Sequence, residues 1–147
     1  MQKNGFLGID VSKGYADFVL LDGKKKLLVQ GFKLYDTRKG HDELLKRLGQ
    51  FKSIYDLERL VCGVESTGGY ENNWYRSIRA QKADMGIEVY RLNPVGVKHQ
   101  GKSEMTRTVT DPVAAETIAR YLADKYDKIR VKPQPDMDQA QARKFYH

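Results

Sequence analysis

Three acidic residues occupy positions that suggest a role in binding a cation. Asp10 lies inside an apolar, strand-like run, Glu65 ends another, and Asp111 immediately precedes a predicted helix. A carboxylate among apolar neighbours is costly unless it is paired or bound to a metal ion. Carboxylate oxygens suit hard cations such as Mg²⁺ and Mn²⁺, and such ions support phosphodiester chemistry. Convergence of Asp10, Glu65 and Asp111 would therefore create a divalent-metal site.

Each of these acids also has a structural explanation. Asp10 could cap the turn at residues 12–14, because Asp commonly accepts hydrogen bonds from backbone N–H groups two residues on. Glu65 could pair with an arginine, and Asp111 could serve only as the N-cap of the helix that follows it. Spacing along the chain leaves both explanations open for all three residues.

A basic segment leads directly to Asp111. Between residues 91 and 107 it carries four cations and one acid, namely Arg91, Lys98, Lys102 and Arg107 with Glu104. Cations beside a carboxylate cluster are what a phosphate backbone requires. We expect this segment to be a loop, and we expect Lys98, Lys102 and Arg107, together with Lys13, to contact DNA or RNA.

The other polar motifs favour structural roles. Cys62 is the single cysteine, which excludes an intramolecular disulfide and a multi-cysteine zinc site. The glycine pair at 68–69 lacks the rest of a phosphate-binding loop and predicts a plain turn. Trp74 and Tyr75 fall at helical positions that favour the core.

The composition describes one soluble, basic domain. The chain has 147 residues, 40% hydrophobic and 31% charged, and 26 Lys and Arg against 19 Asp and Glu give a net charge of +7. This balance favours a polyanionic partner such as nucleic acid, although a basic domain without such a partner has the same charge. No apolar run approaches the length of a membrane span, and no signal peptide is evident at the N-terminus. We therefore expect no membrane association and a cytoplasmic location.

The order of predicted elements indicates a mixed sheet. Strands are predicted at 6–11, 15–21, 27–35, 60–65 and 87–92, and helices at 40–50, 70–82 and 112–126. Gly31 inside the third strand suggests a bulge, and residues 51–58 could continue the first helix or form a connection. Three antiparallel strands followed by α/β alternation predict an α/β fold of ribonuclease-H-like order, flanked by helices. Many other α/β folds would fit the second half alone.

Four motifs occur in an order that resembles one protein family. They are Gly8-Ile9-Asp10-Val11-Ser12-Lys13, Val64-Glu65-Ser66-Thr67-Gly68-Gly69-Tyr70, Leu92-Asn93-Pro94 with Val97-Lys98, and Thr110-Asp111 leading into Ile118-Ala119-Arg120-Tyr121. Together they resemble the N-terminal domain of DEDD insertion-sequence transposases, relatives of the pilin-gene invertases. The resemblance covers roughly residues 5–125.

The resemblance implies a RuvC-like fold whose D-E-D-D acids bind Mg²⁺ or Mn²⁺. Asp10, Glu65 and Asp111 match the first three acids and would be both catalytic and metal-binding. The family pattern T-D-x-x-D-A places the fourth acid at position 114, where this chain has Ala114. Loss of that carboxylate should weaken metal binding and impair cleavage. The sequence does not separate an engineered change from a natural one.

The resemblance also implies the function of the parent protein. We expect residues 1–127 to form the catalytic domain of a DNA transposase or site-specific recombinase, with 128–147 starting a linker to a C-terminal domain. Expected partners are DNA, a guide (bridge) RNA as in some members, and further copies of the full-length chain. We expect this chain to be inactive or nearly so by itself. The alternatives are a Holliday-junction resolvase and a non-catalytic nucleic-acid-binding domain.

Overall fold

A computed structural model describes residues 3–66, 68–80, 85–103 and 114–131. The strands are β1 (Asn4–Ser12), β2 (Tyr15–Asp22), β3 (Leu27–Tyr35), β4 (Arg59–Glu65) and β5 (Ile87–Leu92), and the helices are α1 (Arg38–Ile54), α2 (Asn72–Arg79), α3 (Pro94–Ser103) and α4 (Ala114–Ile129). No helix in these ranges is both long and apolar enough to cross a membrane.

The five strands form one mixed sheet in the order β3-β2-β1-β4-β5. β1 pairs antiparallel with β2, and β2 pairs antiparallel with β3. β4 is parallel to β1, and β5 is parallel to β4. The predicted α/β sheet of three antiparallel strands followed by parallel strands is therefore confirmed. The bulge expected near Gly31 is also present, because the β2–β3 register shifts between the Phe18↔Phe32 and Leu20↔Val29 pairs.

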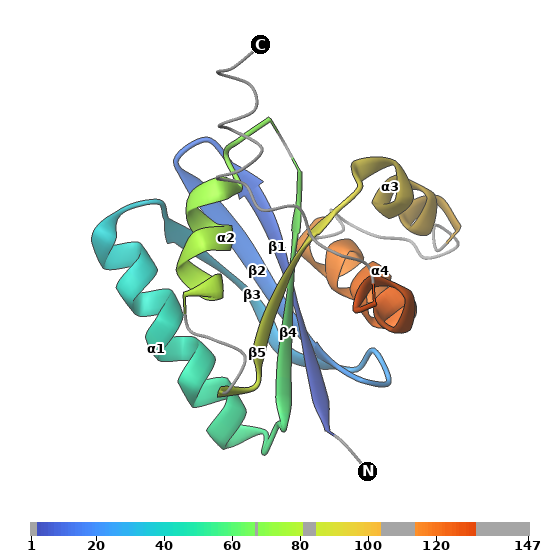
Figure 1. Ribbon diagram of the computed structural model, residues 1–147, viewed down its shortest axis with the longest axis horizontal. Coiled ribbons are helices and arrows are strands. Elements are labelled where there is room, and N and C mark those ends of the chain that lie inside the picture. Colours follow the sequence, from blue (N-terminus) through green and yellow to red (C-terminus); the bar gives the residue numbers. More distant parts are fainter. Residues whose placement is uncertain (1–2, 67, 81–84, 104–113, 132–147) are drawn as a thin grey trace.

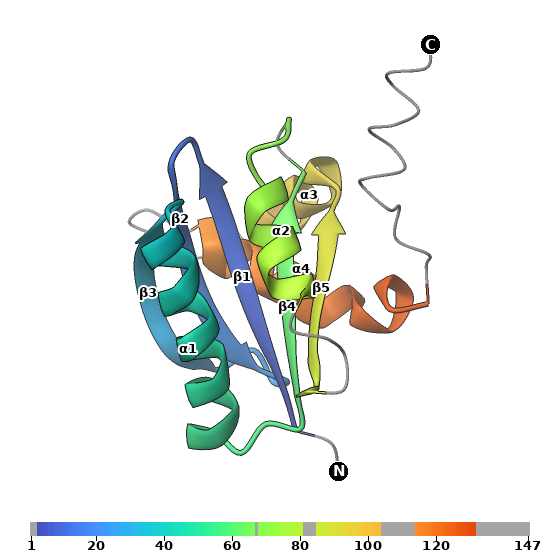
Figure 2. The ribbon, with the colours of Figure 1, turned by 60° about the vertical axis from the view of Figure 1, so that its left-hand side comes forward.

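Helices cover both faces of the sheet. Figures 1 and 2 show α1 and α2 on one face and α4 on the other, with α3 beyond the end of β5. The larger core cluster lies under α1 and α2 and includes Ile9, Phe18 and the fully buried Trp74. The smaller clusters lie under α4. Trp74 and Tyr75 are buried, as predicted, and Cys62 is buried too.

A glycine on β1 allows α4 to lie close to the sheet. The apolar stripe of α4, Ala115, Ile118, Ala119 and Leu122, is fully buried. A Cβ atom at Gly8 would collide with the carbonyl oxygen of Ala115 and lie 2.6 Å from the backbone nitrogen of Ala119. Only glycine permits this approach of helix backbone to strand. The start of α4 is thereby set directly against β1.

The helix α1 is longer than predicted. Its N-cap is Thr37, whose hydroxyl accepts a hydrogen bond of 3.1 Å from the Gly40 N–H, and it continues to Ile54 rather than ending near residue 50. The side chain of Phe51 is buried in the core, which explains why the last turn forms. Residues 51–54, left open by the sequence, therefore belong to the helix.

The basic segment was predicted to be a loop. This prediction was wrong for residues 94–103, which form α3. Pro94 occupies the first helical position, and the Asn93 side chain accepts a hydrogen bond of 2.8 Å from the Val95 N–H, as an N-cap does. Arg91 belongs to β5, and its side chain is only 7% exposed. It therefore does not extend the exposed basic surface. Residues 104–107 lie outside the described ranges.

Candidate metal and nucleic-acid site

Asp10 and Glu65 end neighbouring parallel strands. The last paired residues of β1 and β4 are Ile9 and Val64, so the two acids follow at the next position of each strand. Ile9 and Val64 are buried under α1 and α2. Because side chains alternate across a sheet, both acids face the opposite side, where α4 lies. The predicted convergence of Asp10 and Glu65 is therefore seen in the structure.

Both carboxyls are partly buried, and the pKa of each is raised. Burial raises the pKa of Asp10, and the negative charge of Asp17 raises it further. Burial also raises the pKa of Glu65, with a further contribution from Asp10 that Lys98 opposes. Within the described ranges, neither carboxylate has a hydrogen bond or ion pair. The turn cap considered for Asp10 and the arginine partner considered for Glu65 are accordingly not seen there.

Asp17 is a third acid beside this pair, and sequence reasoning missed it. The β1–β2 register places Asp17 directly opposite Asp10, so their side chains share one face of the sheet. The length of the β1–β2 turn could have revealed this pairing. The turn has two residues, Lys13 and Gly14, so Ser12 pairs with Tyr15, and Asp10, two residues earlier, pairs with Asp17. No group of three or more residues in the described ranges is arranged to hold a metal ion. Asp17 is a charged neighbour of Asp10 and raises its pKa.

Two of the predicted nucleic-acid contacts lie at the same end of the sheet as the acids. Lys13 is exposed in the turn that follows β1. Lys98 is exposed on α3, and its positive charge acts to lower the pKa of Glu65. Lys102 falls within α3, but its side chain is not among those described. Asp111 and Arg107 lie outside the described residues.

Position 114 is the first residue of α4, and Ala114 is exposed there. The carbonyl group of its neighbour Ala115 lies against Gly8. Gly8 is two residues before Asp10 on the same face of β1, a distance of about 7 Å along a strand. The family's fourth position therefore lies at the start of a helix that meets β1 beside Asp10.

Hydrogen bonds and a buried ion pair fix the loop that follows Glu65. The Ser66 N–H donates to the Leu92 carbonyl at 3.1 Å, and the Gly69 N–H donates to the Glu71 carboxylate at 3.0 Å. Glu71 lies 3.9 Å from the Arg91 guanidinium, which is stacked 3.6 Å from the centroid of the Tyr75 ring. Burial lowers the pKa of Arg91. These contacts tie the carboxyl end of β4 to β5 and α2.

A second polar network lies between α1 and α2. His41 contacts the Asp36 carboxylate at 2.6 Å and the Ser77 hydroxyl at 2.7 Å, and its ring is stacked on Trp74 at 4.2 Å. The network therefore joins the start of α1 to α2 over the buried Trp74, which is a structural role.

Comparisons with known proteins agree on fold and family. The family model DEDD_Tnp_IS110, described as Transposase, matches residues 7–145. No curated protein matches the chain. T. thermophilus RuvC, solved in complex with a Holliday junction substrate, is 14% identical with a TM-score of 0.58, covering 87% of this chain and 96% of that one. The fowlpox virus Holliday junction resolvase is 12% identical with a TM-score of 0.49, covering 86% and 99%. The first of these establishes a RuvC-like fold.

Proposed function

Because this chain belongs to the DEDD_Tnp_IS110 transposase family, we propose that Asp10, Glu65 and Asp111 hold the divalent cation of its DNA-cleaving site. The chain is the RuvC-like domain of a DNA transposase, an enzyme of DNA cleavage and strand transfer. The observation that supports the proposed ligands is the pair of partly buried carboxylates, each with a raised pKa, just past the last β1–β4 pair.

The donor set fits a hard cation. Asp10 and Glu65 offer carboxylate oxygens from rigid strands, which is the chemistry that Mg²⁺ and Mn²⁺ prefer. Burial raises the pKa of each, and a neighbouring carboxylate raises it further, Asp17 for Asp10 and Asp10 for Glu65. A cation bound between Asp10 and Glu65 would offset this concentration of negative charge. When bound, a divalent cation supplies charge stabilisation and activation of the attacking oxygen. The particular ion, Mg²⁺ or Mn²⁺, is part of this proposal.

The protein side chains would orient the substrate. Asp10 and Glu65 lie at the end of the sheet that Lys13 and Lys98 flank. We propose that these lysines, together with Lys102 and Arg107, bind the DNA backbone on either side of the scissile phosphate. A guide RNA and a homo-oligomeric assembly remain predictions for the full-length protein, as does a domain boundary at 127.

Ala114 would leave the site short of one carboxylate. Position 114 follows Asp111 by three residues in the sequence, and the family pattern T-D-x-x-D-A has an acid at both positions. We therefore propose that this chain binds metal weakly and cleaves DNA slowly or not at all. That prediction also favours a second function, a non-catalytic nucleic-acid-binding domain that ignores magnesium.

The test is Mn²⁺ binding by calorimetry, with cleavage of a labelled DNA duplex and a four-way junction measured in parallel. Ala114→Asp should bind Mn²⁺ at least about tenfold more tightly than the unaltered chain, and adding Asp10→Asn or Glu65→Gln should abolish that gain. Salt-dependent DNA binding without metal binding in either chain would support the non-catalytic function. Cleavage restricted to the junction would support a resolvase.

A further inference from the structure

The carboxyl end of β3 continues the face of the sheet on which the acids lie. Asp10 is opposite Asp17, and Asp17 is opposite Lys33 of β3. Two residues further on, Tyr15 is opposite Tyr35. Residues directly opposite each other share a face, so Lys33 and both tyrosines lie on the same face as Asp10. The distance across two strand spacings is about 10 Å.

This part of the face is aromatic, basic and open. The side chain of Tyr35 is 61% exposed, and its ring centroid lies 6.5 Å from that of Tyr15 at an angle of 58°. The Lys33 ammonium lies 4.4 Å from the centroid of the Tyr15 ring. In the described ranges Lys33 forms no ion pair with Asp17. An exposed ring beside an exposed cation matches the chemistry of an unpaired nucleotide, whose base stacks and whose phosphate is negative.

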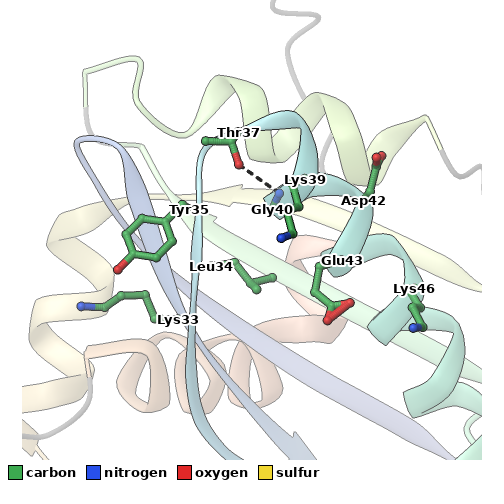
Figure 3. A pocket seen from close by; sticks show the side chains of 9 residues that line it. All are labelled: Lys33, Leu34, Tyr35, Thr37, Lys39, Gly40, Asp42, Glu43 and Lys46. Atoms are coloured by element: carbon green, nitrogen blue, oxygen red, sulfur yellow. Dashed lines mark hydrogen bonds between the residues drawn. The ribbon is translucent and has the colours of Figure 1, made fainter.

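A cavity adjoins these residues at the free edge of the sheet. Its volume is about 510 Å³, and it lies between the end of β3 and the first turns of α1. Its lining includes three lysines, Lys33, Lys39 and Lys46, against Asp42 and Glu43. Figure 3 shows Lys33 and Tyr35 projecting to one side of β3, with Leu34 on the other side beside α1. The cavity therefore adds cations at the β3 edge, on the α1 side of the strand, across from Lys33 and Tyr35.

We propose that Tyr15, Lys33 and Tyr35 form a binding surface for a single, unpaired DNA strand that leaves the metal site toward the β3 edge. This proposal rests on the proposed function, because the strand is assigned by continuity with the acids. Tyr35 stacks on one base, and Lys33 contacts the adjacent phosphate. Lys39 and Lys46 attract the backbone where the strand passes around the β3 edge toward α1. Duplex DNA would not expose a base to Tyr35, so the surface selects an unpaired strand.

The test is binding of a fluorescein-labelled oligo-dT to the full chain in EDTA, followed by anisotropy. Tyr35→Ala should weaken binding by roughly tenfold, as loss of one base–aromatic stack does, whereas Tyr35→Phe should bind like the unaltered chain. Lys33→Gln should weaken binding and reduce the slope of log K against log salt by about 0.7. Ile54→Ala removes a side chain that is 69% exposed at the far end of α1, and Lys128→Gln makes the same charge change on α4. Neither control should match the loss at Tyr35 or Lys33.

Three outcomes would overturn the proposal. They are unchanged oligo-dT binding by Tyr35→Ala, an equal loss in Tyr35→Phe, or an equal effect of Tyr35→Ala on a blunt duplex. Preferential binding of an RNA oligomer with the same dependence on Tyr35 would overturn the assignment to DNA. Mn²⁺ calorimetry on the same variants separates this surface from the metal site. Tyr35→Ala should leave Mn²⁺ binding unchanged. If no chain binds Mn²⁺, Ala114→Asp included, that result contradicts the proposed metal site and not the binding surface at Tyr35.

Discussion

Asp10 of β1 and Asp17 of β2 lie directly opposite each other in an antiparallel pair, so two carboxylates occupy neighbouring positions on one face of the sheet. Like charges placed opposite each other are destabilising in a sheet. Asp10 also lies next to Glu65, whose pKa it raises. The fold thus maintains a concentration of negative charge at the end of β1 that no described cation neutralises by direct contact.

Replacing Asp17 should make Asp10 a stronger acid. Asp17→Asn removes the negative charge that raises the pKa of Asp10, so that pKa should fall while remaining above the usual value because burial persists. The measurement is a carboxyl ¹³C NMR titration of Asp10. Asp127→Asn, which changes an exposed carboxylate on α4, should leave the pKa of Asp10 unchanged. A rise in that pKa after Asp17→Asn would contradict the interpretation.

Without bound metal, Asp10 and Glu65 should lower the stability of the folded protein at neutral pH. A carboxyl with a raised pKa in the folded state binds more protons folded than unfolded, so its contribution to stability falls as pH rises from about 4 through the raised pKa. Asp10→Asn and Glu65→Gln should therefore be more stable than the unaltered chain at pH 7 in EDTA. The gain should be about 1 kcal/mol or less, because both groups are only partly buried. Urea unfolding between pH 4 and pH 8 tests this, and equal or lower stability of both variants at pH 7 would be contrary evidence.

Mn²⁺ binding should strengthen as pH rises. Protons compete with the metal for Asp10 and Glu65, and the raised pKa values extend this competition above the usual carboxylate range. Thermal shift of the Ala114→Asp chain in Mn²⁺ should grow between pH 5 and pH 7, as expected when a ligand binds only the folded state. Adding Asp10→Asn should remove the shift at both pH values. A shift independent of pH would place the bound metal elsewhere.

Gly8→Ala should destabilise the protein by disturbing the packing of α4 against β1. The added Cβ would collide with the Ala115 carbonyl group and lie 2.6 Å from the Ala119 nitrogen, and backbone cannot yield as a flexible side chain would. Overpacking of this kind costs about 1–3 kcal/mol or more. Gly49→Ala is the matched control, because its Cβ meets nothing within 4 Å and glycine is unfavourable inside a helix. Guanidinium unfolding should show destabilisation by the first change and a slight gain by the second.

The strands and the main helix stripes could be predicted because they depend on local pattern. The stretches 27–35 and 87–92 were predicted with the bounds of β3 and β5, since alternating residues between turns carry a clear period. The helix α3 could not be predicted in the same way. Its sequence PVGVKHQGKS contains two glycines and few apolar residues. It forms where Val97 is buried and where Gly96 leaves room for the ring of Tyr121.

By itself, the sequence determined the five strands, the helices other than α3, and the family. It also singled out Asp10 and Glu65, because a charge inside an apolar run is visible without coordinates. Only the tertiary structure decided what lies beside them. Strand register placed Asp17 opposite Asp10 and brought Lys33 and Tyr35 onto the same face. It also showed that Arg91, counted among the cations of the basic segment, is buried against Tyr75. The physical reason is that hydrogen-bonded pairing, which joins residues distant in the chain, sets which side chains share a face.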